Sequence, residues 1–298
     1  MHNYSNLLLT ALITIVPFGF SRADEVDPRR PAAIQTEGVP IVPAEVFERL
    51  AQYQNIRAAG FSGWSPDGRG ILVRTRFGNS SQLHRVHEPG GRREQITFFD
   101  EPVRGRFIPQ AQDGAILLSI SLGGNENYQI HLLNRKDFKT TRLTDGKSRN
   151  GMGPILDDGS KMIISSNKRN GRDTDLYVAD PRKPNSMKIV FPTNRQYWYA
   201  ADWTPDGATL LLGRYVSINE SYPALLDLVS RRKRPIPVPA PGKVSFGDMT
   251  FSADGKKLYV ACDAISEASC QFIQEHAAAN SEAPFFLEGP LKQGLERA

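Results

Sequence analysis

Two similar tetrapeptides carry side chains that could bind a ligand: Asn125-Glu126-Asn127-Tyr128 and Asn219-Glu220-Ser221-Tyr222, which begin 94 residues apart. Their carboxylate, amide and phenol groups could hold a peptide terminus or a partner protein. Acid–base catalysis by paired carboxylates would need a further element, a cleft or a metal ion. Hairpin turns repeated by duplication would explain the same residues without any ligand.

A catalytic serine is not indicated. Serine hydrolases of the α/β class place the nucleophile in a Gly-x-Ser-x-Gly turn between a strand and a helix. The nearest match is Gly60-Phe61-Ser62-Gly63-Trp64, which lacks the last glycine and lies in a segment expected to be a strand. We therefore expect no catalytic residue in this chain.

Histidine and cysteine do not show the spacing of metal ligands. His84 and His87 are three residues apart on an expected strand, where alternation directs them to opposite faces. His131 is alone on its strand. Cys262 and Cys270 could form one disulfide or remain reduced. We expect neither a metal ion nor a cofactor.

An internal repeat positions these residues. Asp-Gly occurs at residues 67–68, 113–114, 158–159, 206–207 and 254–255, in steps of 46, 45, 48 and 48 residues. The pair suits a tight hairpin, because glycine accepts a positive φ and aspartate can bond to nearby backbone. A short apolar strand follows each turn. Where the pattern continues, two more strands begin 16 to 19 and about 30 residues after the aspartate.

Together with the strand before each turn, this pattern gives four short strands per repeat, which is typical of a β-propeller blade. A βαβ repeat would need a helix in each unit, and no 3.6-residue periodicity is present there. The sequence predicts an all-β propeller of about five four-stranded blades, preceded by a short helix over residues 43–57. We expect the aromatic residues Trp64, Trp203 and Phe251, on the innermost strands, to pack between neighbouring blades.

The end of the fifth blade has two interpretations. Phe272-Ile273 and Phe285-Phe286 stand where its third and fourth strands are expected, but residues 264–279 also have the pattern of an amphipathic helix. Because the segment after residue 279 shows little strand pattern, we expect the second interpretation, in which no third or fourth strand completes the blade. Blade five would then have two strands and a bare edge that could recruit other chains, leaving the propeller open.

The propeller would bring the candidate binding residues to one face. Both Asn-Glu-x-Tyr segments, and a polar stretch of blade three, fall between the second and third strands of their blades. The candidate binding residues are Asn125, Glu126, Tyr128, Arg169, Arg172, Asn219, Glu220 and Tyr222.

The repeat resembles that of TolB-like propellers, in which Ser-Pro-Asp-Gly precedes a strand, a polar turn and an Ile/Leu-Tyr-x-x-Asp strand. Residues 165–180, SSNKRNGRDTDLYVAD, match it well. Residues 51–70, 123–133 and 217–228 also resemble the N-terminal propeller of the prolyl oligopeptidase family of serine peptidases, in its dipeptidyl-peptidase or acylaminoacyl-peptidase branch. In that family a C-terminal hydrolase domain carries a Ser-Asp-His triad. The resemblance covers about residues 40–262 and implies a propeller without the hydrolase domain.

Residues 1–23 have the pattern of a secretory signal peptide. Residues 7–20 are an uncharged apolar run of 14 residues, too short for a membrane span, and small residues stand three and one positions before a cut ahead of Asp24. An uncleaved anchor is the alternative. We expect the signal peptide to be removed, which gives a periplasmic or secreted chain with no stable membrane span.

The rest of the chain divides into three predicted parts. Residues 24–42 would be a linker, 43–262 the propeller, and 263–298 a tail that ends blade five, forms a helix or is disordered.

The charge of the mature chain does not indicate a nucleic-acid partner. Its 36 basic and 32 acidic residues are spread along the sequence, and the densest basic run, residues 231–234, is typical of a solvated loop. A propeller lyase for acidic sugars would need a metal ion and converging histidines, whereas the five histidines here are scattered.

We therefore expect a non-catalytic substrate-gating or binding module, a truncated or split relative of the peptidases. Its partner would be a peptide or protein, for example a separate hydrolase domain or an envelope protein. A stand-alone periplasmic protein-interaction module of the TolB type is the alternative.

Overall fold

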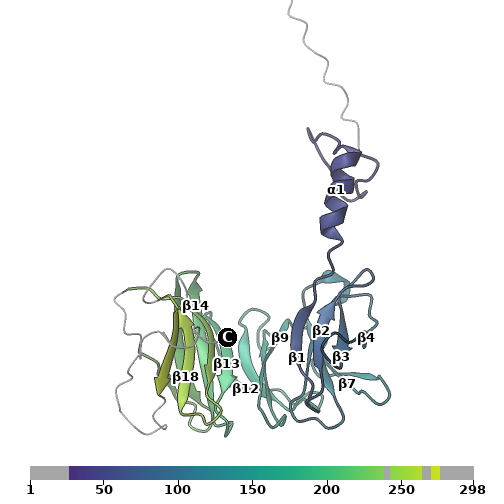
Figure 1. Ribbon diagram of the computed structural model, residues 1–298. Helices are drawn as coiled ribbons and strands as arrows, with labels where there is room; N and C mark the ends of the chain where they lie inside the picture. Colours follow the sequence, from purple (N-terminus) through teal and green to yellow (C-terminus); the bar gives the residue numbers. More distant parts are fainter. Residues whose placement is uncertain (1–26, 238–241, 264–269, 276–298) are drawn as a thin grey trace, which may run out of the picture. The chain divides into compact units, whose positions relative to one another are not determined.

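The computed structural model describes residues 27–237, 242–263 and 270–275 (Figure 1). The chain forms two compact units, which divide between Ile56 and Arg57. The predicted signal peptide lies outside the described residues. Within the described ranges, no helix is long and apolar enough to cross a membrane.

The first unit contains the predicted helix, α1 (Ala44–Gln54). It begins directly after Pro43, whose carbonyl accepts hydrogen bonds from the amides of Val46 and Phe47 at 3.1 and 3.2 Å. Proline suits the start of a helix because its missing N–H has no partner to lose there.

The second unit is all-β, as predicted. Its strands form five antiparallel sheets, each built from strands consecutive in sequence. The first four sheets have four strands each: β1 (Gly60–Trp64) to β4 (Arg93–Gln95), β5 (Val103–Phe107) to β8 (Thr140–Arg142), β9 (Asn150–Ile155) to β12 (Lys188–Phe191), and β13 (Tyr197–Trp203) to β16 (Lys233–Pro235).

The strands between these ends are β2 (Ile71–Thr75), β3 (Gln82–Val86), β6 (Ile116–Ile120), β7 (Gln129–Leu133), β10 (Met162–Ser166), β11 (Asp175–Ala179), β14 (Thr209–Ser217) and β15 (Glu220–Asp227). A single turn of 3₁₀ helix, η1 (Leu122–Gly124), lies between β6 and β7. Each of these four sheets therefore has the four-strand order expected of a blade.

Each Asp-Gly pair is a turn between the first and second strands of its blade, as predicted. The glycine amide donates to the carbonyl three residues earlier, at 3.0 Å from Gly68 to Ser65 and 2.8 Å from Gly207 to Thr204. Both glycines have positive φ, 69° and 66°, which a residue with a Cβ adopts only at a cost.

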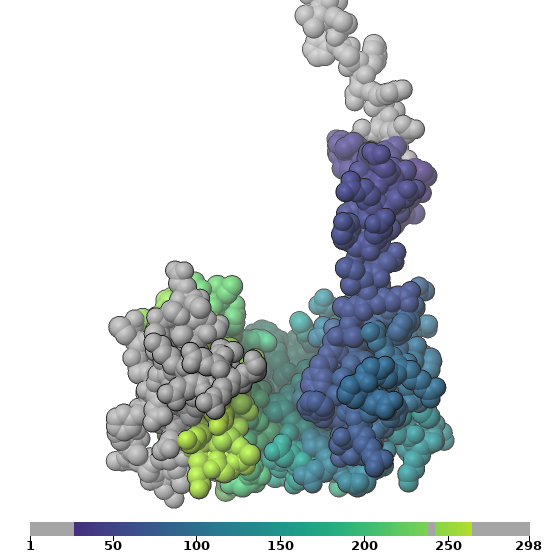
Figure 2. Space-filling view, viewed as in Figure 1, coloured from purple at the N-terminus to yellow at the C-terminus, as the bar shows by residue number. Residues whose placement is uncertain are grey.

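The core consists of apolar layers between consecutive blades. Leu72 and Leu83 of blade one pack with Ile116 of blade two, and further layers join the later blades in sequence. Alternate residues of β6 enter the layers on its two sides, so this strand is buried on both faces. Figure 2 shows a surface that continues from the blue first blade to the green fourth blade.

Two of the three predicted inter-blade aromatics are buried. Trp203 and Phe251 are 4% and 8% exposed and pack in the layers that join their blades to neighbouring ones. The expectation for Trp64 is wrong, because its side chain is 75% exposed. Blade one is the first sheet of the chain, and no described sheet precedes it to cover this residue.

Blade five has three described strands: β17 (Phe246–Phe251), β18 (Lys257–Cys262) and β19 (Cys270–Glu275). The expected two-stranded ending is therefore wrong. β19 pairs with β18 along its full length, because Phe272-Ile273 continues the hairpin register. That register places Cys270 opposite Cys262. The suggested fourth strand at Phe285-Phe286 lies outside the described residues.

Candidate functional site

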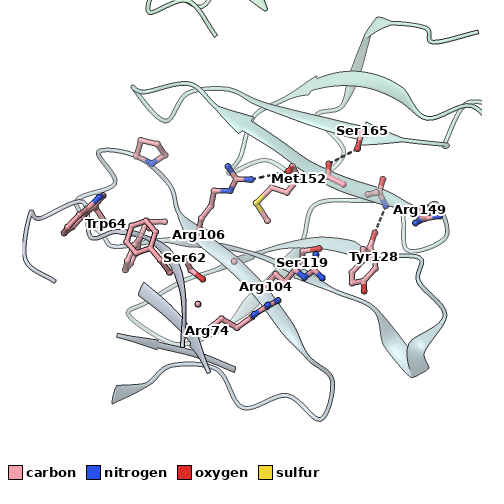
Figure 3. A pocket seen from close by; sticks show the side chains of 18 of the residues that line it. Ser62, Trp64, Arg74, Arg104, Arg106, Ser119, Tyr128, Arg149, Met152 and Ser165 are labelled. Atoms are coloured by element: carbon pink, nitrogen blue, oxygen red, sulfur yellow. Dashed lines mark hydrogen bonds between the residues drawn. The ribbon is translucent and has the colours of Figure 1, made fainter. Parts of the chain in front are cut away.

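A cavity of about 1240 Å³ lies among the first strands of blades one to three and the start of β13 in blade four (Figure 3). Pockets for small molecules usually enclose about 300–1,000 Å³. The cavity is therefore large enough to hold a segment of polypeptide.

Strand alternation in β5 sets the character of the cavity wall. Val103 and Phe107 are buried in the layer that joins blades one and two. Arg104 and Arg106 alternate with them and line the cavity. Gly105 lies between the two arginines, and a Cβ there would stand 2.6 Å from the carbonyl oxygen of Leu117. Only glycine lets β5 approach its neighbour this closely.

The cavity wall is strongly basic. Arg74 of β2, Arg104 and Arg106 of β5, and Arg149 just before β9 border it, as Figure 3 shows. None of the described residues that line it has a carboxylate. Charges of one sign around a cleft focus the electrostatic field within it, so the cavity favours anionic groups.

Arg106 differs from the other three arginines. It donates a hydrogen bond of 3.2 Å to the carbonyl oxygen of Met152 and so connects blades two and three. Burial lowers the pKa of its guanidinium from the ordinary value. Arg106 therefore positions the wall, while the other arginines remain available to a ligand.

Within the described ranges, no ion pair involves Arg74, Arg104 or Arg149. Arg74 is half-buried, and Arg104 and Arg149 are exposed. A planar guanidinium can bind a carboxylate or phosphate through two parallel hydrogen bonds. These three side chains could therefore contact an anionic ligand directly.

Aromatic side chains border the same cavity. Phe61, Trp64 and Tyr197 line it although they are 60%, 75% and 59% exposed. The rings of Phe61 and Trp64 meet edge to face, with centroids 5.6 Å apart. The wall thus combines exposed apolar area with positive charge.

Of the eight predicted binding residues, the described cavity lining includes only Tyr128, whose carbonyl accepts a 3.0 Å hydrogen bond from Asn150. Its neighbours shape the loop before β7. The side-chain oxygen of Asn125 accepts from the amide of Asn127 at 2.9 Å, and Glu126 is exposed with φ of 59°.

The predicted arginines of blade three contact carboxylates in their own loop. Arg169 bonds to Asp173 at 3.0 Å and to the fully buried Asp175. Arg172 bonds to Asp173 at 3.0 Å. The hydrogen bonds from Arg172 and Asn170 lower the pKa of Asp173 to about 2. Both arginines therefore stabilise the loop between β10 and β11.

The predicted residues of blade four also have local partners. Glu220 forms an ion pair of 2.7 Å with Lys243 and accepts a hydrogen bond of 2.7 Å from Tyr222. Lys243 lowers the pKa of the Glu220 carboxyl. The amide of Asn219 donates to Ser217. Ligand binding by the eight predicted residues remains a prediction. The cavity is a separate feature of the same unit and shares only Tyr128 with them in its described lining.

Sequence reasoning missed the basic residues of the cavity. The available signal was the pair Arg104 and Arg106, two residues apart on the strand before an Asp-Gly turn. That spacing places both on one face of a first strand. Arg74 and Arg149 come from other blades, and only the tertiary structure brings them to the same cavity.

Ser62 lies on β1, as expected, and not at a strand-to-helix turn. Among the described residues that line the cavity with it, none is a histidine or carboxylate that could act as its base. The wall thus carries arginines that can bind anions and aromatic rings that can contact apolar groups.

Solved structures share this fold. TolB from Acinetobacter baumannii matches with a TM-score of 0.55 and 19% identity, over 80% of this chain and 55% of TolB. A putative TolB from Agrobacterium tumefaciens matches with a TM-score of 0.53 and 16% identity, over 78% of this chain and 83% of that protein. The fold is that of a TolB-like propeller. This confirms the fold class and the resemblance predicted from the sequence.

A prolyl endopeptidase shares the propeller, with a TM-score of 0.59 and 9% identity over 78% of this chain and 36% of the endopeptidase. The TolB-like propeller described here thus spans about half of the first TolB and about a third of the endopeptidase. No protein-family model and no curated protein matches the sequence. At these identities, the similarity concerns the fold alone.

Proposed function

We propose that this TolB-like propeller is a non-catalytic binding module that holds a segment of a peptide or protein in its cavity. The observation that carries the proposal is the cavity of about 1240 Å³, which is bordered by strand edges, exposed aromatic rings and arginines. Strand edges can bond to an extended peptide through its backbone. The ligand could be a substrate passing to a separate hydrolase domain or part of an envelope protein.

Export is part of the proposal. The pattern of residues 1–23 supports removal of a signal peptide and a periplasmic or secreted location. The propeller would then meet partners outside the cytoplasm.

Site-specific photo-crosslinking tests the binding role. We would place p-benzoylphenylalanine at Phe61 or Tyr197, which line the cavity, and at Phe98, which is 77% exposed and lies outside the described lining. In the native host, we expect discrete crosslinked partners from the two cavity positions alone. A purified partner should then bind the unmodified chain and bind Phe61→Ala more weakly. Equal crosslinking from Phe98, or none from the cavity, would contradict the proposal.

The same proposal predicts no hydrolase activity. The purified chain should not turn over peptide nitroanilides or nitrophenyl esters, because Ser62 has no base among the described lining residues. A fluorophosphonate probe provides the measurement. Stoichiometric labelling of one serine, with turnover lost when that serine is replaced, would show that the chain is an enzyme.

A further inference from the structure

We propose that the cavity selects acidic segments: an extended peptide whose aspartate or glutamate side chains are bound by Arg74, Arg104 and Arg149. This inference rests on the proposed function and adds the chemical class of the ligand. Three features carry it: the unpaired arginines, the strand edges and the geometry of the aromatic rings.

The first feature is a contrast among the arginines of this chain. Several arginines of this unit that join loops or turns are matched by a carboxylate, as Arg182 is by Asp113 at 2.8 Å and Arg85 is by Asp67 at 2.7 Å. In the described residues, Arg74, Arg104 and Arg149 form no such pair although they line one cavity. Like charges in one cleft repel each other, and an anionic ligand removes that repulsion.

The second feature is the position of the first strands in their sheets. β1, β5 and β9 are edge strands, and residues of all three line the cavity. An edge strand has backbone N–H and C=O groups that an extended peptide can pair with. Small anions and nucleotides cannot pair along a strand in this way, so the edges favour a peptide.

The third feature is the arrangement of the aromatic rings. Binding of single-stranded nucleic acid uses rings on which successive bases stack. Phe61 and Trp64 meet with an interplanar angle of 65°, so one ring edge faces the other ring. This pair presents apolar contact area to a peptide side chain and no parallel slot for a base.

Synthetic peptides test the charge preference directly. We would use the full chain and fluorescein-labelled 12-residue peptides in which glutamate, glutamine or lysine alternates with serine. Fluorescence anisotropy at low salt should show binding of the glutamate peptide about tenfold tighter than that of the glutamine peptide, and none of the lysine peptide. Affinity for the glutamate peptide should fall as salt screens the charges.

Arginine variants locate the site. Arg104→Gln and Arg149→Gln should each weaken binding of the glutamate peptide about fivefold or more. The matched control is Arg69→Gln, because Arg69 is exposed and lies outside the described lining. The double variant Arg104→Glu, Arg149→Glu should prefer the lysine peptide. Both residues are exposed, and thermal unfolding checks that each variant is folded.

Four outcomes would overturn the inference. Equal affinity for the glutamate and glutamine peptides would remove the charge preference while leaving the proposed binding function in place. Tighter binding of the oligonucleotide dT12 would indicate a nucleic-acid ligand. Displacement of the peptide by an equal concentration of inorganic phosphate would indicate a small-anion site. An unchanged affinity in the Arg104 and Arg149 variants would place the peptide elsewhere. Failure of the proposed function itself would appear separately, as an absence of crosslinks from Phe61 and Tyr197.

Discussion

The same turn motif occurs as Gly63-Trp64-Ser65-Pro66-Asp67-Gly68 in blade one and as Asp202-Trp203-Thr204-Pro205-Asp206-Gly207 in blade four, with opposite results for the tryptophan. Trp203 is 4% exposed and donates a hydrogen bond of 3.2 Å to the carbonyl oxygen of Pro154 in blade three. Trp64 is 75% exposed and lines the cavity.

The comparison separates what the motif encodes from what its neighbours add. Both motifs form the same turn, with glycine φ of 69° and 66°. The burial of Trp203 comes from the preceding blade, and blade one has no described blade before it. A repeated residue can thus stabilise the core in one blade and remain available for binding in another.

Replacing the two tryptophans should give the largest difference between the motifs. Trp203→Ala should lower the free energy of unfolding by about 3–5 kcal/mol, because it leaves a hole between blades three and four. Trp64→Ala should change it by less than about 0.5 kcal/mol. Urea denaturation of both variants measures the difference. Equal losses would show that Trp64 is covered in solution.

The turn glycines should differ in the same direction. A Cβ at Gly207 would stand 2.8 Å from Leu156 Cδ2, whereas a Cβ at Gly68 would meet nothing within 4 Å. Gly68→Val should cost about 1–2 kcal/mol from backbone strain alone. Gly207→Val should cost about 2–4 kcal/mol, because overpacking adds to the strain. If Gly68→Val lowers the melting temperature more than Gly207→Val does, the close contact between Gly207 and Leu156 is wrong.

The residue before each tryptophan provides a third comparison. Asp202 accepts hydrogen bonds of 2.6 Å from the Thr250 hydroxyl and 2.8 Å from the Phe251 amide, and so joins blade four to blade five. Gly63 has no side chain for such a bond. Asp202→Ala should lower the free energy of unfolding by about 1–3 kcal/mol.

Thr250→Val is the matched control for that bond network, because it removes one of the two hydrogen bonds and keeps the acceptor. In chemical denaturation, Thr250→Val should lower the free energy of unfolding by less than Asp202→Ala does. An Asp202→Ala variant as stable as the wild type would mean that the carboxylate does not hold the blades together.

The smallest expected effect concerns pH. The hydrogen bond from Arg182 in blade three lowers the pKa of Asp113 in blade two from 3.8 to about 2. The pair therefore stabilises the folded state above about pH 4, and this contribution is lost as pH falls toward 2. The pair is partly exposed, so it should contribute at most about 1 kcal/mol.

Denaturation at several pH values tests this pair. Asp113→Asn should show a shallower loss of stability between pH 4 and 2 than the wild type. Arg182→Gln should behave in the same way, because it removes the partner that lowers the pKa. Parallel pH profiles for the wild type and both variants would contradict the assignment.

Much of the fold could be predicted from the sequence because the Asp-Gly turns and the apolar strands after them are local signals. The strand at Phe272-Ile273 was not expected, because its apolar pattern is short and stands beside an alanine-rich segment that favours a helix. The basic cavity could not be predicted in full. Arg74, Arg104 and Arg149 are far apart in sequence, and each alone has the pattern of an exposed, solvated residue. Only the packing of the blades places them around one cavity.

Hydrogen–deuterium exchange with and without the glutamate peptide tests the central claim, that the ligand binds among the first strands of the blades. β4 and β8 are the internal controls, because they lie at the opposite edges of the sheets that contain β1 and β5. We predict slower exchange of backbone amides in β1 and β5 when the peptide is bound, and no change in β4 and β8. Unchanged exchange in β1 and β5, or equal slowing in β4 and β8, would contradict the account.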